Sequence, residues 1–355
     1  MHTYRILFFP FALIYEMIVR LRHFLFDVGI LKSKTFKVPL IGVGNLVVGG
    51  SGKTPHVELL IRMLFEENKV AVLSRGYGRK TKVYVKADQY SKYEDIGDEP
   101  MQYYRKFKKN VTIAVDANRR KGIKNLIEDK AGHDVIIMDD SFQHRYVKPG
   151  ISILLTDFHT LYTSDFLLPV GKLRDVGSAA KRADIIIVTK TNKVLSPITR
   201  RNIEEKINPE PHQKLYFSYI KYGNFIPMPG INKGSFPREI NTILLFTGIA
   251  NPYPLQEHLR FRCSELVAID FPDHHNYSKS DLIKVREKFD TFFTRKKIIV
   301  TTEKDAMRLI NSPYISELNN LPVFFLPMEI AIHKEDRQSF NNQIVKYVRE
   351  NKLSS

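Results

Sequence analysis

The sequence is poor in cysteine and tryptophan and short of acidic residues. Its 355 residues include one cysteine, Cys263, and no tryptophan. A single cysteine excludes an intrachain disulfide and a multi-cysteine metal site, and it fits a reducing compartment. With 38 Asp and Glu against 55 Lys and Arg, the formal net charge is +17. Such an excess attracts polyanions, namely nucleic acid, anionic lipid or phosphorylated substrates, although a solvated basic surface without a dedicated partner has the same composition.

The chain also lacks a hydrophobic run that is long enough to cross a membrane as a helix. The segment "YRILFFPFALIYEMIVRLRHFLFDVGIL" (4–31) is the most apolar part of the sequence. Its longest uncharged run, 6–15, is about half of what a spanning helix needs. No small-residue cleavage site precedes Glu16, which argues against a secretory signal.

Helical spacing divides this N-terminal segment into a polar stripe and a wide apolar face. The stripe consists of Glu16, Arg20, His23 and Asp27. The apolar face consists of Leu13, Ile14, Met17, Ile18, Leu21, Phe24 and Leu25. This division favours a helix that lies in a membrane interface, with Arg22 extending along its edge toward water. The alternative is a helix whose apolar face is buried against the rest of the protein.

A glycine-rich stretch at 47–60, "VVGGSGKTPHVELL", has the form of a phosphate-binding loop. The apolar run before it predicts a buried strand, and apolar residues at helical spacing after it predict a helix. Lys53 would reach the β- and γ-phosphates, and the Thr54 hydroxyl would bind Mg²⁺. The absence of the usual first glycine mainly relaxes the entry turn. We expect nucleotide contacts from Val47, Val48, Gly49, Gly50, Ser51, Gly52, Lys53 and Thr54.

Polar side chains follow another buried strand. "VIIMDD" (135–140) ends with Asp139 and Asp140, at the position where phosphate-loop enzymes hold Mg²⁺, directly or through water. "SFQHR" (141–145) then presents Gln143 and His144 at the same edge. A solvated acidic pair is the alternative. The sequence therefore favours a metal and nucleotide site at this end of the strand.

Several other polar motifs are less specific. "IGDEP" (96–100) carries two adjacent carboxylates, which alone would favour a helix cap. "SRGYGR" (74–79) suits anion contact or a tight basic turn, and "DANRRKG" (116–122) suggests a solvated basic face. "DHHNY" (273–277) is a weak metal motif because spacing places no third ligand. "TKTN" (189–192) is similar to the guanine-binding motif of GTPases, but Asn192 stands where that motif needs Asp.

Strand-like runs alternate with helical segments over most of the chain, which predicts an α/β fold. We expect a P-loop NTPase-like, mainly parallel sheet with helices on both faces, and a smaller Rossmann-like α/β domain joined to it by a β-ribbon. The expected boundaries are 1–35 for the N-terminal amphipathic helix, 36–212 for the P-loop domain, 213–238 for the β-ribbon linker and 239–355 for the C-terminal domain.

The ordered set of motifs resembles the tetraacyldisaccharide 4'-kinase family. "GNLVVGGSGKTP", "SRGYGR", "GDEP", "DANRRKG", "DDSFQH", "LPVGKLRD", "FTGIANP", "FPDHHNY" and "TTEKDAMRL" follow in that family's order and approximate spacing. The resemblance covers nearly the whole chain. It implies transfer of the γ-phosphate of ATP, with Mg²⁺, to the 4'-hydroxyl of an acylated glucosamine disaccharide 1-phosphate, giving lipid IVA in lipopolysaccharide synthesis.

The resemblance also implies roles for individual residues. Asp98 matches the family's proposed general base and His274 its partner, while Lys53 and Arg174 match groups near the phosphates. Gln143 and His144 match a nucleotide-contacting segment, in which Ser141 replaces the usual glycine. The expected Mg²⁺ ligands are Thr54, Asp139, Asp140 and Glu99.

These expectations extend to partners and location. The acceptor is a membrane lipid, so the basic surface and the N-terminal helix would meet an anionic membrane, at the cytoplasmic face of the inner membrane. We expect a peripheral or monotopic monomer that binds no nucleic acid, because the chain lacks zinc-finger spacing and an RNA-recognition motif. The alternatives are a membrane-docked nucleotide switch, another small-molecule kinase, or a basic nucleic-acid-binding ATPase.

Overall fold

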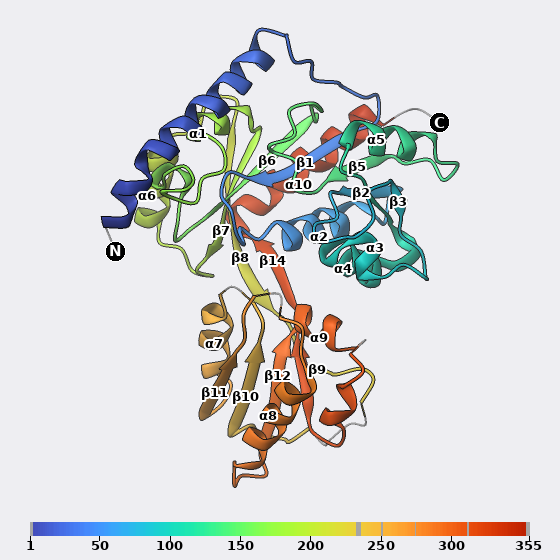
Figure 1. Ribbon diagram of the computed structural model, residues 1–355, viewed down its shortest axis with the longest axis vertical. Coiled ribbons are helices and arrows are strands. Elements are labelled where there is room, and N and C mark those ends of the chain that lie inside the picture. The colour runs from blue at the N-terminus through green and yellow to red at the C-terminus, as the bar shows by residue number, and fades with distance from the viewer. Residues whose placement is uncertain (1–2, 232–235, 250, 274, 311, 353–355) are drawn as a thin grey trace. The chain divides into compact units, whose positions relative to one another are not determined.

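A computed structural model describes residues 3–231, 236–249, 251–273, 275–310 and 312–352. It divides the chain into two compact units, which are shown in Figure 1. Unit 1 comprises Met1–Ile220 and Ile330–Ser355, and unit 2 comprises Lys221–Glu329.

Unit 1 is built around a nine-stranded sheet in the order β14-β8-β7-β6-β1-β5-β2-β4-β3. Its strands are β1 (Leu40–Asn45), β2 (Val70–Ser74), β3 (Val85–Lys86), β4 (Thr112–Val115), β5 (Val135–Met138), β6 (Ile151–Asp157), β7 (Ile185–Thr191), β8 (Lys214–Tyr222) and β14 (Met328–Ile332). The pairings from β8 through β4 are parallel, and β3 pairs antiparallel with β4. Central strands such as β1 and β2 are buried throughout, because helices cover both faces.

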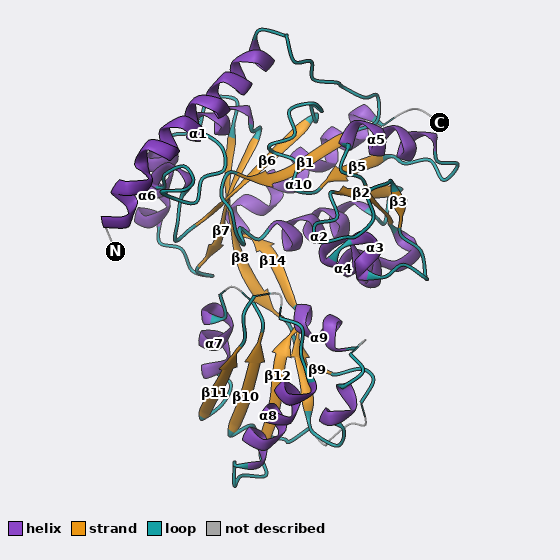
Figure 2. Cartoon of the chain, viewed as in Figure 1, coloured by secondary structure: helices purple, strands orange, loops and turns teal. Residues whose placement is uncertain are grey.

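The helices of unit 1 are α1 (Thr3–Asp27), α2 (Lys53–Leu64), α3 (Tyr93–Ile96), α4 (Asp98–Phe107), α5 (Arg119–Glu128), α6 (Pro197–Ile207) and α10 (Lys334–Asn351), with short 3₁₀ turns η1 (Lys108–Asn110), η2 (Tyr162–Ser164) and η3 (Gly177–Arg182). The helices and strands are coloured separately in Figure 2. Apolar residues of α2 and α10 share a core with Ile41 and Val43 of β1. Residues of α5 share another core with Leu40. The predicted α/β class, with a mainly parallel sheet and helices on both faces, is confirmed.

Unit 2 contains a five-stranded sheet in the order β11-β10-β12-β13-β9. Its elements are β9 (Ile226–Pro227), β10 (Thr242–Thr247), α7 (Tyr253–Arg260), β11 (Glu265–Asp270), α8 (Lys279–Asp290), β12 (Lys297–Thr302), α9 (Glu303–Leu309), η4 (Ile315–Leu318) and β13 (Val323–Leu326). All pairings are parallel except that of β9 with β13.

The unit boundaries differ from the predicted domains in two ways. Residues 330–355 were expected in the C-terminal domain, but they belong to unit 1. There α10 buries Phe340, Ile344 and Val348 in the core beneath the large sheet. The segment 213–238 was expected to form a β-ribbon linker. Its first strand, β8, is instead hydrogen-bonded to β14 in the nine-stranded sheet, whereas β9 joins the sheet of unit 2. Both differences are long-range pairings, which local sequence patterns do not encode.

The N-terminal helix α1 turns its apolar face away from the protein. Leu13, Ile14, Met17, Ile18, Leu21 and Phe24 are all more than half exposed. The opposite side packs on unit 1, where the Tyr15 hydroxyl donates to Arg174 O at 2.9 Å. The alternative hypothesis, in which the apolar face of this helix is buried against the rest of the protein, is therefore wrong. Among the described residues, no helix is long and apolar enough to span a membrane.

The polar stripe of α1 is not a simple water-facing stripe. His23 Nε2 lies 2.5 Å from Asp175 Oδ1, and Arg145 Nη2 lies 2.6 Å from Asp27 Oδ1. The predicted extension of Arg22 toward water is also wrong, since its guanidinium donates to Gln143 O at 3.0 Å. Polar contacts hold this helix to the protein because its inward side carries these groups.

Candidate active site

The glycine-rich loop joins the buried strand β1 to the first turn of α2, as the sequence predicts. Gly49 and Gly52 have φ values of 107° and 84°, a region in which a side chain would be strained. Val47 needs no such freedom, because it forms an antiparallel bridge with Leu173. The Val48 N–H then donates to Lys172 O at 2.8 Å, so a neighbouring segment supports the start of the loop.

Lys53 lies at the centre of a charged cluster at the loop. Its Nζ is 3.6 Å from Asp140 Oδ1 and 3.4 Å from Asn45 Oδ1. Arg174 donates to both carboxylate oxygens of Asp140 and to Asn45 Oδ1, the last at 2.5 Å. Two cations therefore share one carboxylate. A ligand with additional negative charge would find both of them beside the glycine-rich backbone.

Asp139 occupies a different environment from its neighbour. It is 1% exposed, and Oδ2 accepts from the Tyr103 hydroxyl at 3.3 Å and from the Ser74 hydroxyl at 3.4 Å. The Thr54 side chain is also hydrogen-bonded to Tyr103. In the described part of the chain, Asp139 Oδ1 is buried and lacks a hydrogen-bond partner. A buried carboxylate oxygen of this kind is costly unless a ligand or water satisfies it.

The two carboxyl groups have pKa values shifted in opposite directions. Burial and the adjacent charge of Asp140 raise the pKa of Asp139. Burial also acts to raise the pKa of Asp140, but the Arg174 hydrogen bond and the charges of Lys53, Arg174 and Arg119 lower it to about 2. Asp140 is therefore ionised at neutral pH. Arg119 is 2% exposed, so it does not lie on the predicted solvated face. Its charge reaches this edge because its guanidinium donates to Asp139 O at 3.0 Å.

A cavity of about 380 Å³ lies beside Asp140. It is lined by Tyr15, Val19 and Arg22 from α1, by Arg75, Asp140, Gln143 and His144 from strand ends, and by Arg174 and Asp175. Three arginines thus line a space between the N-terminal helix and the acidic end of β5. Such a cavity suits an anionic molecule.

Gln143 and His144 lie at this cavity, as expected from their position after β5. The Gln143 amide donates to Asn45 O at 2.6 Å, which links it to the end of β1. Burial and the positive charges of Arg119 and Arg75 lower the pKa of His144 to about 4, so its ring is neutral at neutral pH. Ser141, which replaces the family glycine, fits because its hydroxyl lies against Gly42, where no side chain stands.

Asp98 and Glu99 open α4 and are half-buried in its first turn. Gly97 is the N-cap, so neither carboxylate is the cap residue itself. Burial raises the pKa of the Tyr103 hydroxyl, and the charges of Asp139 and Glu99 raise it further. Both carboxylates are therefore near this hydroxyl. His274 lies outside the described residues, so its pairing with Asp98 stays a prediction.

Some residues of this site were missed by sequence reasoning. Asn45 contacts Lys53, Gln143 and Arg174, although the sequence analysis assigns it no role. Tyr103, fully buried in α4, bridges Asp139 and Thr54. A tyrosine on the buried face of a helix cannot be distinguished from an ordinary core residue by sequence. An Asn at the end of an otherwise apolar strand, in contrast, could have been recognised as a candidate site residue.

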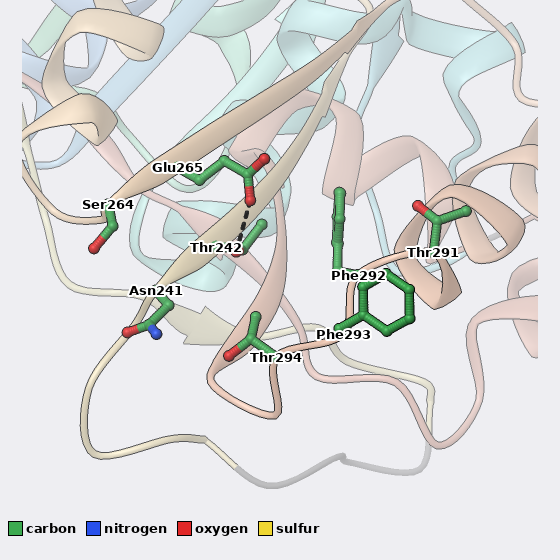
Figure 3. A pocket seen from close by; sticks show the side chains of 8 residues that line it. All are labelled: Asn241, Thr242, Ser264, Glu265, Thr291, Phe292, Phe293 and Thr294. Atoms are coloured by element: carbon green, nitrogen blue, oxygen red, sulfur yellow. Dashed lines mark hydrogen bonds between the residues drawn. The ribbon is translucent and has the colours of Figure 1, made fainter.

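A second cavity, of about 480 Å³, lies in unit 2 (Figure 3). Its walls include Asn241 and Thr242 at the start of β10 and Glu265 at the start of β11. Glu265 accepts a hydrogen bond from Thr242 at 3.0 Å. This cavity lies at the amino ends of the parallel strands, whereas α/β sheets bind ligands at the carboxyl ends. It contains none of the predicted site residues.

Several known proteins with similar sequences carry the same name. A family model described as Tetraacyldisaccharide-1-P 4'-kinase matches residues 4–349. The tetraacyldisaccharide 4'-kinase of Bacteroides thetaiotaomicron is 46% identical over 358 residues, covering 98% of this chain and 94% of that protein. The enzyme of the same name from Flavobacterium johnsoniae is 43% identical over 353 residues, covering 99% of each.

A solved structure is similar over the same length. The crystal structure of LpxK from Aquifex aeolicus in complex with ATP superposes with a TM-score of 0.71. The two sequences are 27% identical, and the match covers 98% of this chain and 99% of the other. The similarity therefore includes both units and the N-terminal helix.

Proposed function

The chain belongs to the tetraacyldisaccharide 4'-kinase family, and from that membership we propose how its own residues serve the reaction. The family and the kinase activity predicted from the sequence are thereby confirmed. The reaction is ATP-dependent phosphorylation of the 4'-hydroxyl of a lipid A precursor. One observation supports our assignment above all: an arginine-lined cavity lies between the inner side of α1 and Asp140, which pairs with Lys53 of the phosphate loop.

Lys53 and Arg174 are the proposed electrostatic contacts to the phosphoryl group. Both pair with Asp140, whose pKa of about 2 keeps it charged. Phosphoryl transfer has a loose transition state, so fixed positive charges and positioning supply most of the catalysis. The loop backbone from Val47 to Thr54 would hold the β- and γ-phosphates, with Gln143 and His144 at the neighbouring edge.

The residues beside the loop fit Mg²⁺. Thr54, Asp139, Asp140 and Glu99 offer the hard oxygen donors that this ion prefers. Asp139 supports the assignment best, because within the described residues its Oδ1 is buried and lacks a partner. When bound, the ion would offset charge on the phosphate oxygens. Tyr103 fixes Asp139 and Thr54 relative to one another through its hydroxyl.

Asp98 is the proposed general base for the acceptor hydroxyl, with His274 as its partner. A sugar hydroxyl is a poor nucleophile until a nearby group accepts its proton, and such a base contributes typically about 10²–10⁴-fold. We expect Asp98→Ala and His274→Ala each to lower turnover strongly, and the double variant to be little worse than the poorer single one. ATP affinity should change much less; its loss in Asp98→Ala would make Asp98 a metal ligand instead.

The acceptor is proposed to reach the site along α1. That helix exposes its apolar face to the outside and contributes Tyr15, Val19 and Arg22 to the cavity on its inner side. An interfacial helix would dock the enzyme on an anionic membrane, and the lipid's charged head would enter the cavity while its chains stay in the bilayer. This arrangement favours a peripheral or monotopic enzyme at the cytoplasmic face of the inner membrane.

A direct test uses labelled ATP and the tetraacyldisaccharide 1-phosphate in mixed micelles. We expect label in a lipid product phosphorylated at the 4' position, dependent on Mg²⁺. A matched reaction with labelled GTP tests the nucleotide-switch alternative, which predicts GTP preference and an unlabelled lipid fraction. Label that appears only as inorganic phosphate would contradict acceptor phosphorylation by this site.

A further inference from the structure

Three consecutive carbonyl groups of the phosphate loop are each held by a side chain from outside the loop. Lys190 Nζ donates to Gly50 O. The Thr189 hydroxyl lies 3.1 Å from Ser51 O, with Thr156 O slightly farther away at 3.3 Å. His56 Nδ1 lies 2.7 Å from Gly52 O.

The direction of these bonds matters for anion binding. A trans peptide is planar, so its C=O and the following N–H point in opposite directions. Fixing the carbonyls of Ser51 and Gly52 on one side therefore fixes the N–H groups of Gly52 and Lys53 on the other. Backbone N–H groups at a helix N-terminus are the groups that bind phosphate. Thr189 and His56 thus act on the cradle without occupying it. Lys190 holds the carbonyl that precedes Ser51, whose N–H donates to Gly49 O at 3.0 Å and so supports the turn that leads into the cradle.

Lys190 is held in an unusual backbone conformation. Its φ is 60°, a left-handed value that is rare for a residue with a side chain, and it lies within an irregularity of register between Val188 and Thr191 of β7. Such a conformation is strained and persists where surrounding contacts impose it. Here the ammonium group is held by Gly50 O and by Asp157 Oδ2, at 2.6 Å from the latter.

His56 is held by contacts at both of its ring nitrogens. It is 2% exposed, and its Nε2 lies 2.9 Å from Ser218 Oγ. Burial lowers its pKa to about 4, so the ring is neutral. A carbonyl only accepts, so Nδ1 carries the proton and donates to Gly52 O, while Nε2 accepts from Ser218. The ring therefore connects the loop to β8.

We propose that Lys190, Thr189 and His56 are positioning residues that hold the phosphate loop in its nucleotide-binding conformation by fixing its outer carbonyls. The inference rests on the proposed function, since it presupposes that the loop binds ATP. It assigns a role to "TKTN" other than recognition of a base: Thr189 and Lys190 act on the loop backbone.

Lys190→Met tests the proposal by removing the ammonium group while keeping most of the side chain. We expect the Kd for ATP, measured by calorimetry with the full chain and Mg²⁺, to rise by about tenfold, the ratio that loss of one charge-assisted hydrogen bond represents. Lys190→Arg should restore most of the affinity. Lys193→Met, at an exposed lysine three residues away, is the matched control and should bind ATP like the wild type.

Thr189→Val provides a second variant of nearly the same shape. It should weaken ATP binding less than Lys190→Met, because the lost donor is neutral. Melting temperatures without nucleotide separate positioning from folding. A lowered melting temperature with unchanged ATP affinity in both variants would overturn the proposal, because the side chains would then be structural only. Wild-type protein that binds no ATP would contradict the proposed function itself.

Discussion

The two long helices near the ends of the chain both pack on unit 1, but they bury opposite kinds of surface. α10 places Phe340, Ile344 and Val348 against the sheet, each at most 1% exposed. α1 leaves Leu21 and Phe24 exposed by 57% and 58% and turns polar groups toward the protein. An amphipathic pattern therefore predicts that a helix has an apolar face. Only the tertiary structure shows whether the rest of the protein buries that face.

The difference has an energetic meaning. Each large apolar side chain of α10 contributes roughly 1.5–3 kcal/mol to folding by its burial. The apolar face of α1 contributes nothing of that kind until a partner covers it, and a contiguous exposed apolar face marks an interaction surface. Its attachment relies on the other side of the helix, where Phe26 is buried and where His23 contacts Asp175 and Arg145 contacts Asp27.

The largest expected effect is on folding. Ile344→Asp would leave an unpaired charge in the core, which should cost roughly 4 kcal/mol or more of unfolding free energy. Ile18→Asp in α1 should change it by less than about 1 kcal/mol, because Ile18 is 60% exposed. Urea unfolding of both variants measures the contrast. Equal destabilisation would show that the apolar face of α1 belongs to the folded core.

The next effect concerns membrane docking. Replacing Leu21 and Phe24 with Asp should weaken binding to vesicles that contain anionic phospholipid by at least about tenfold, since two apolar anchors are lost. Co-sedimentation measures it, and turnover of vesicle-borne acceptor should fall with it. Asp at Phe261 and Phe293, which are 89% and 105% exposed in unit 2, provides the control. If the α1 variant still bound vesicles and the control variant did not, the membrane-docking surface would lie on unit 2 and not on α1.

A smaller effect separates the two sides of α1. Arg22→Ala should raise the KM for the acceptor severalfold, roughly 1 kcal/mol, and change the Kd for ATP much less, because Arg22 lines the cavity and its guanidinium donates only to the backbone O of Gln143 in the contacts described. Arg20→Ala is the matched control for Arg22→Ala, because Arg20 lies on the same helix, is exposed and pairs with Glu16. Steady-state kinetics in mixed micelles gives both constants. A rise in KM of equal size in both variants would indicate a general charge effect.

A further effect is a pH dependence of the stability of unit 1. Burial lowers the pKa of His56 to about 4 and also lowers that of His333, the N-cap of α10. The unfolded chain then binds more protons below about pH 6.5, so stability present above that pH is lost as pH falls toward 4. Melting curves should show it, with a flatter profile in His56→Gln and an unchanged one in His212→Gln, at an exposed histidine. A wild-type profile flat from pH 7 to 5 would contradict neutral burial.

Local features of the fold were predictable from the sequence because they depend on neighbouring residues. The apolar run before Gly49 and the helical spacing after Lys53 specify a strand, a loop and a helix within a short stretch. The carboxylates after β5 lie beside that loop because parallel strands present their carboxyl ends at one edge. The family motifs extended this to the activity.

The remaining features depend on distant contacts. The membership of α10 in unit 1 depends on a core formed with α2, and the pairing of β8 with β14 depends on the chain's return from unit 2. The hydrogen bond from Lys190 to the phosphate loop was not predictable, because Lys190 bonds to a residue 140 positions earlier. Its motif, "TKTN", is instead similar to the guanine-binding motif of GTPases. Which side of α1 the protein covers likewise depends on residues such as Asp175.

The most direct test of the central claim is the turnover of Lys53→Ala with the lipid acceptor. The account assigns Lys53 to the transferring phosphoryl group, so turnover should fall at least ~100-fold, as expected when a preorganised transition-state contact is removed. The variant should remain folded, because the Lys53 side chain belongs to the polar cluster with Asn45 and Asp140 and not to the apolar core. Lys193→Ala should retain wild-type turnover. Near-normal turnover of a folded Lys53→Ala protein would contradict phosphoryl transfer at this loop.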